Sequence, residues 1–151
     1  MAKRLPILFA ICGLWWGAAH AQQEPCSEAE HLQVEGEADT LRSWDALFRS
    51  YRLYEHCRDV DAAEGYSESV ARILVDHWET LPRLSELMKN DKSFRHFALS
   101  HVDATLDMRD VRRIRTNAIQ RCPEGLTELC QELRKGADAA IEEDASVRKK
   151  Q

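Results

Sequence analysis

Apolar residues recur at steps of three and four along most of this 151-residue chain. The pattern is clear in the set Leu41, Trp44, Leu47, Phe48 and Tyr51, which would share one face of an α-helix. No segment shows the alternation of apolar and polar residues that is typical of a half-buried β-strand. The sequence therefore predicts an all-α fold, a single-domain bundle of five or six helices.

Turn and capping residues divide this helical region into segments. We expect helices over about 39–56, 59–81, 94–103, 105–122 and 126–144, with a short turn of helix at 84–88. Together they form a helical domain over residues 38–144, which follows a flexible N-terminal arm at 22–37 and precedes a charged tail at 145–151. Gly65 lies in the first turn of the second helix, where its lack of a side chain would let a neighbouring helix approach the backbone.

The first 21 residues have the pattern of an export signal. Lys3 and Arg4 precede an apolar run that ends at about residue 19, and an A-x-A tripeptide ends at Ala21. The apolar run is shorter than the roughly 20 residues of a membrane span. We therefore expect cleavage of a signal peptide at residues 1–21, near Ala21. The resulting chain would be periplasmic or secreted, without stable membrane insertion.

Four cysteines would remain after this cleavage: Cys26, Cys57, Cys122 and Cys130. An even number of cysteines in an oxidising compartment favours two disulfides, for which three pairings are possible. We favour Cys122–Cys130, which flanks a Pro-Glu-Gly turn signal, together with Cys26–Cys57. A competing arrangement links Cys57 to one of the C-terminal pair. The spacing of the cysteines is not that of a zinc site, so no metal is expected.

The clearest candidate for catalysis is His101, with Asp103 or Asp107 as the carboxylate of a general base. This pairing would make the chain a small hydrolase-like enzyme. In the alternative interpretation, His101 closes the apolar stripe of its helix and Asp103 is a turn or capping acid. The chain has no Gly-x-Ser-x-Gly elbow and no glycine-rich phosphate loop. We therefore expect a non-catalytic protein without a cofactor.

Two sets of residues are candidates for binding a protein partner. The first is a basic cluster within one helix, made of Arg109, Arg112, Arg113 and Arg115. It would suit an acidic protein or an anionic polymer of the cell envelope. Alternatively, it is a solvated helix face with local ion pairs. The formal net charge of −5 argues against a nucleic-acid partner.

The second set is aromatic and consists of Tyr54 and Tyr66. Aromatic side chains at the edge of a groove commonly anchor protein partners. The alternative is that both tyrosines belong to the core and only their hydroxyl groups reach the surface.

Three short segments resemble a family of small exported helical proteins. They are Tyr54-Glu55-His56-Cys57, the helix start at Glu64–Val70, and Cys122-Pro123. In these features the chain is similar to the immunity proteins that protect the bacterial periplasm from secreted cell-wall amidases of type VI systems. The resemblance implies a helical fold and a role in binding or blocking a partner protein, and it assigns no partner-contacting loop to particular residues. We therefore expect an exported protein-binding module, with a general structural or stress role in the envelope as the alternative.

Overall fold

The computed structural model describes residues 26–57 and 60–150, without the side chains of residues 60–62. The described residues confirm the all-α fold and form one compact domain without a β-strand. The elements are α1 (Glu28–Ala38), α2 (Trp44–Leu53), η1 (Glu55–Cys57), α3 (Val60–Asp76), η2 (Trp78–Thr80), α4 (Leu81–Asn90), α5 (Lys92–Ser100), α6 (Met108–Gln120) and α7 (Thr127–Arg148). The two η elements are single 3₁₀ turns, so the described part of the chain has seven α-helices where the sequence predicted five or six.

The additional helix is α1, and it corrects the prediction of a flexible arm at residues 22–37 for its described part, while residues 22–25 lie outside the described residues. Ser27 caps this helix: its Oγ accepts from the Glu30 backbone N–H at 3.3 Å, and the Glu30 carboxylate accepts from the Ser27 N–H at 3.0 Å. In α1 only Val34 and Ala38 are buried, so the apolar periodicity is too weak to predict the helix. The next helix begins at Trp44 rather than near residue 39, because Ser43 caps it.

The C-terminal helix also runs further than predicted. α7 continues to Arg148, four residues into the segment that was expected to be a charged tail. Within its last turns Arg148 pairs with Asp144, and the Ser146 hydroxyl donates to the Glu143 carbonyl. None of the helices in residues 26–57 and 60–150 has the length and apolar character needed to cross a membrane. The predicted signal peptide lies outside the described residues.

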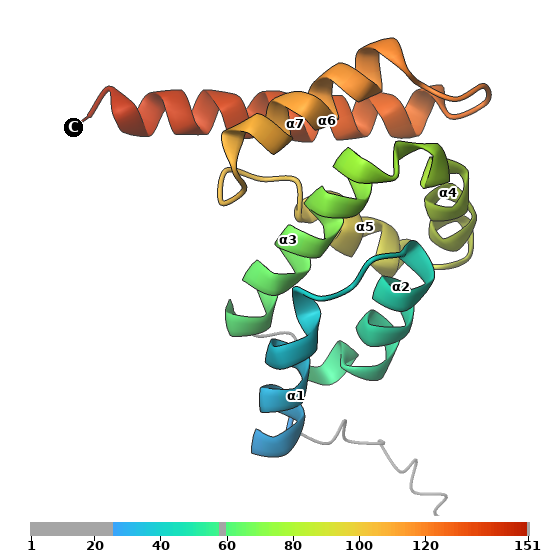
Figure 1. Ribbon diagram of the computed structural model, residues 1–151, viewed down its shortest axis with the longest axis vertical. Helices are drawn as coiled ribbons and strands as arrows, with labels where there is room; N and C mark the ends of the chain where they lie inside the picture. The colour runs from blue at the N-terminus through green and yellow to red at the C-terminus, as the bar shows by residue number, and fades with distance from the viewer. Residues whose placement is uncertain (1–25, 58–59, 151) are drawn as a thin grey trace, which may run out of the picture.

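Helix α3 lies against α1 at one end and against α6 at the other (Figure 1). The contact with α1 is made close to the backbone, as the position of Gly65 led us to expect. A Cβ atom at Gly65 would lie 2.9 Å from the Ala38 Cβ and 3.0 Å from the Asp39 backbone nitrogen. The Ser69 hydroxyl donates to the Ala38 carbonyl at 2.6 Å in the same contact. The end of α1 is therefore fixed to α3 by close packing and by hydrogen bonding.

An aromatic cluster joins α2, α3 and α5 in the core. Tyr51 of α2 lies between Phe94 and Phe97 of α5, with ring centroids 5.2 and 4.7 Å apart. Tyr66 of α3 meets Phe97 edge-on at 5.1 Å. All four rings are buried, so this cluster supplies a large share of the apolar area that the bundle removes from water.

Helices α6 and α7 form an antiparallel hairpin that lies across one end of the molecule (Figure 1). Gly125, whose φ of 77° favours glycine, lies in the turn between them. The Cys122–Cys130 disulfide joins the two helices next to this turn, and Cys26–Cys57 joins the start of α1 to η1. Both disulfides have the favoured pairing, and the competing link from Cys57 to the C-terminal pair is therefore wrong.

Candidate protein-docking surface

The four predicted arginines all lie on α6, outside its buried stripe. Asp107 caps this helix, and its carboxylate accepts from the Arg109 backbone N–H at 2.8 Å. The buried side of α6 consists of Val111, Ile114, Asn117 and Ala118. Because the arginines occupy positions between these residues, the helical repeat turns them away from the core. We call Arg109, Arg112, Arg113 and Arg115 the α6 arginine surface.

Two of these four arginines are engaged in ion pairs. The Arg109 guanidinium lies 2.6 Å from the Asp107 carboxylate, and this contact holds the pKa of Asp107 at about 2. Arg115 Nε donates to Asp138 of α7, so this ion pair links the two helices of the hairpin. Arg134 lies on the other side of the same carboxylate, at 3.7 Å. These charges are already compensated within the protein.

Arg112 and Arg113 differ from the other two. Both are exposed, and neither forms an ion pair with a carboxylate in residues 26–57 or 60–150. The one hydrogen bond of the Arg112 guanidinium is to the Met108 carbonyl of its own helix, at 3.3 Å. The charge of Arg112 interacts with Asp107 across the helix, but no carboxylate of the described residues contacts either guanidinium, so both can pair with carboxylates of another molecule.

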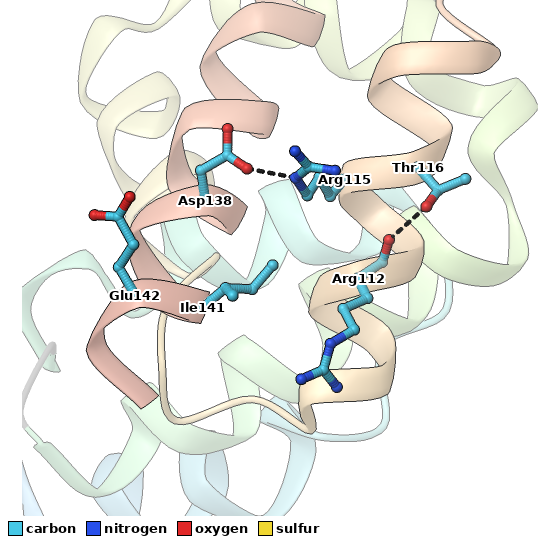
Figure 2. Close-up of a pocket in the computed structure, with 6 residues that line it drawn as sticks. All are labelled: Arg112, Arg115, Thr116, Asp138, Ile141 and Glu142. Carbon is cyan, nitrogen blue, oxygen red and sulfur yellow. Dashed lines mark hydrogen bonds and ion pairs between the residues drawn. The ribbon is translucent and has the colours of Figure 1, made fainter. Parts of the chain in front are cut away.

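A groove of about 660 Å³ runs beside Arg112, between α6 and α7. Figure 2 shows Arg112, Arg115 and Thr116 on the α6 wall and the acidic residues of α7 opposite. The complete lining is Arg112, Arg115, Thr116, Asp138, Ile141 and Glu142. The Arg115–Asp138 ion pair bridges the two walls, while the Ile141 side chain points into the space between the helices (Figure 2). The groove thus combines a small apolar floor with charged walls.

The two tyrosines proposed as partner anchors lie in the core. Tyr54 is 4% exposed and Tyr66 is 3% exposed. The Tyr66 hydroxyl lies 2.8 Å from Ser50 Oγ, and that serine donates to Glu37 at 2.6 Å. Burial raises the pKa of Tyr66 to about 12. In this structure both rings are covered by the bundle, which agrees with the alternative that they are core residues.

His101 is buried as well, and its hydrogen-bond partner is a serine. Its Nδ1 lies 2.8 Å from Ser67 Oγ, and burial lowers its pKa to about 4. The Asp103 carboxylate instead accepts from the Thr105 backbone N–H at 2.8 Å, as a turn acid would. Within the described residues, His101 forms no hydrogen bond with Asp103 or Asp107. The His–Asp pairing that was considered for catalysis is therefore not assembled here.

One trio of side chains has the composition of a metal site. Glu30, His56 and Cys57 place their ligand atoms within 4.8 Å of one another. The Cys57 sulfur, however, is bonded to Cys26 and is not available as a thiolate. Glu30 and His56 instead lie 3.3 Å apart as a hydrogen-bonded pair that holds α1 against η1. The disulfide and this hydrogen bond show that the three side chains serve to hold the start of α1 against η1.

Sequence reasoning located the α6 arginine surface but missed the acidic wall of the groove. Asp138 and Glu142 are four residues apart on α7 and so lie on the same side of that helix. The Cys122–Cys130 disulfide could have located them, because it sets which residues of α7 lie opposite the arginines of α6. Comparisons of this chain with models of protein families, with curated proteins and with solved structures gave no match.

Proposed function

We propose that this chain is an exported, non-catalytic protein-binding module that acts as an inhibitor or immunity protein. Its docking site is the α6 arginine surface together with the groove beside it. The observation that supports this proposal is that Arg112 and Arg113 are exposed and form no ion pair with the described residues, next to two arginines that are paired within the protein. The partner is an acidic protein, because carboxylates are the groups that these guanidiniums bind.

The physical argument rests on where the free charges lie. Arg112 lies on the α6 wall of the groove and Glu142 on the α7 wall opposite, so a partner carboxylate binds the exposed Arg112 guanidinium from the α6 side, away from the acidic wall. Arg113, which is exposed on the same helix, attracts an acidic partner from a distance and orients it. This arrangement combines an apolar contact with a charged rim, as in many protein interfaces.

A charge-reversal experiment tests this proposal. Arg112→Glu with Arg113→Glu should weaken binding of a partner purified from the native envelope at least about tenfold, since arginine contacts are frequent energetic centres of interfaces. The matched control is Lys89→Glu with Lys92→Glu. It changes the net charge equally at two exposed residues outside the groove. Equal binding by both variants in a titration would argue against the α6 arginine surface.

The location outside the cytoplasm is part of the same proposal. It is supported by the two disulfides, which form and persist in oxidising compartments. Intact-mass measurement of the protein isolated from its native host should give a chain that starts near residue 22 and carries no free thiol. A chain with its original N-terminus and with reduced cysteines would contradict export.

A further inference from the structure

Four donors of the kind that zinc binds lie together where α1 begins. The ligand atoms of Glu30, His56 and Cys57 lie within 4.8 Å of one another, and the Cys26 sulfur is bonded to that of Cys57. Residues 26–57 and 60–150 hold no other group of three such donors. Two thiolates, an imidazole and a carboxylate suit Zn²⁺, which takes sulfur, nitrogen and oxygen ligands. Since the two sulfurs are bonded to each other in the oxidised protein, only the reduced protein can offer the full set.

The distances between these donors fit a tetrahedral zinc ion. His56 Nε2 lies 3.3 Å from Glu30 Oε1. Zinc bonds of about 2.0–2.2 Å to nitrogen and oxygen place two such ligands roughly 3.4 Å apart. The Cα atoms of Cys26 and Cys57 lie 4.9 Å apart. Rotation about the Cα–Cβ bonds lets the reduced sulfurs move to the separation of about 3.8 Å that zinc–sulfur bonds of about 2.3 Å require.

The helix cap already orients the carboxylate of this set. Glu30 Oε2 accepts from the Ser27 backbone N–H at 3.0 Å and from the Ser27 hydroxyl at 2.6 Å, while Oε1 faces His56. The hydrogen bonds from Ser27 hold the pKa of Glu30 below its usual value, so this group is an anion at neutral pH. The side chains of His56 and Glu30 are 25% and 42% exposed, which gives a metal ion access from the solvent. An oriented and accessible ligand loses little freedom when it binds a metal.

Contacts other than the disulfide hold α1 in place. Val34 and Ala38 of this helix are buried, and the Ser69 hydroxyl of α3 donates to the Ala38 carbonyl at 2.6 Å. The capping box of Ser27 and Glu30 is formed within α1 itself. We therefore expect the donors of α1 and η1 to stay close to one another when the S–S bond is opened.

We propose that reduction of the Cys26–Cys57 disulfide creates a zinc site at the start of α1. Its four ligands are Cys26 Sγ, Cys57 Sγ, His56 Nε2 and Glu30 Oε1. A dithiol reductant supplies the two electrons and two protons that convert the disulfide to two thiols, and the reductant itself becomes a disulfide. Zn²⁺ then binds both sulfurs and releases the two thiol protons. The imidazole stays neutral, with its proton on Nδ1. The metal replaces the disulfide in holding α1 against η1, and the proposal does not depend on the function proposed above.

Titration of the reduced protein with zinc, in competition with a chromophoric chelator, tests this proposal. Every sample carries Cys12→Ser, which leaves only the four cysteines of the described residues. We expect one Zn²⁺ per chain with a Kd below roughly 1 µM, and the release of about two protons at pH 7. The oxidised protein should bind zinc at least about a hundredfold more weakly, because it offers no thiolate.

Matched variants show which pair of cysteines binds the metal. Cys26→Ser with Cys57→Ser should weaken zinc binding at least about a hundredfold, because both sulfur ligands are lost. Cys122→Ser with Cys130→Ser should bind zinc like the unaltered protein, since these cysteines belong to no group of three donors in the described part of the chain. If the loss of affinity follows the second pair instead, the proposal is overturned.

Single variants separate the four-ligand site from a simple chelate of two thiols. His56→Ala and Glu30→Gln should each weaken zinc binding at least about tenfold. Glutamine keeps the helix cap, so the second change acts on the metal ligand alone. X-ray absorption of the unaltered, zinc-loaded protein needs no variant and should show two sulfur neighbours, one imidazole and one oxygen. Unchanged affinity in both single variants, or a zinc ion without an imidazole neighbour, would overturn the proposal.

Discussion

Replacing Gly65 by alanine tests whether the close contact between α1 and α3 depends on the missing side chain. The added Cβ would lie 2.9 Å from the Ala38 Cβ and 3.0 Å from the Asp39 nitrogen. Both neighbouring atoms belong to, or are fixed to, the backbone, so a side-chain rotation cannot relieve the overlap. The end of α1 would have to move, which also disturbs the hydrogen bond from Ser69 to the Ala38 carbonyl.

Two effects of opposite sign act in this variant. Alanine favours the helical backbone over glycine by about 0.5–1 kcal/mol. Overpacking of a closely packed contact costs about 1–3 kcal/mol. We expect the second effect to dominate, with a net loss of about 1–2 kcal/mol in the free energy of unfolding. For a domain of this size, that loss lowers the Tm by roughly 3–8 °C.

Gly36 provides a matched control in α1. No atom lies within 4 Å of a Cβ built at this position, so Gly36→Ala should gain the helix propensity without a clash. We expect a stabilisation of about 0.5–1 kcal/mol. Urea unfolding followed by circular dichroism measures both variants with the disulfides intact. If Gly65→Ala is as stable as the unaltered protein, or if both variants change alike, the role assigned to Gly65 is wrong.

Two further changes concern the disulfides and the buried histidine. Cys26→Ser with Cys57→Ser opens a loop of 31 residues and should lower the free energy of unfolding by about 3–4 kcal/mol. The same change at Cys122 and Cys130, which are 8 residues apart, should lower it by about 2–3 kcal/mol, because the shorter loop restricts the unfolded chain less. The midpoints of urea unfolding compare the two variants. Burial lowers the pKa of His101 to about 4 from its usual 6.5, so the unfolded chain binds a proton at this histidine more readily than the folded protein does. The neutral histidine therefore contributes fully to the free energy of unfolding above pH 6.5, and this contribution is lost as the pH falls toward 4. Unfolding experiments should show a loss of about 2 kcal/mol between pH 7 and pH 5 that is absent in His101→Asn, and an equal loss in that variant would contradict the assignment.

The fold could be predicted from the sequence wherever an apolar stripe fixed the helix. The stripe of α6 predicted both its buried side and the exposure of its arginines, because one helical repeat determines both. The same reasoning missed α1, which buries only Val34 and Ala38 and depends on α3 for its stability. The periodicity also did not distinguish whether Tyr66 is buried in the core or anchors a partner at the surface, because an aromatic residue on a helix face suits either role.

The geometry of the groove follows from the position of the Cys122–Cys130 disulfide. Arg115 lies seven residues before Cys122, and Asp138 lies eight residues after Cys130. At about 1.5 Å per residue these offsets are roughly 10 and 12 Å, so antiparallel helices joined at the disulfide place the two side chains at the same level. Their ion pair forms where this register predicts it. Arg112 lies one helical turn further from the disulfide, and Glu142 lies on the opposite wall of the groove. The two side chains form no ion pair, so Arg112 stays available for a partner. The disulfide thus determines which arginine joins the hairpin and which one faces the groove.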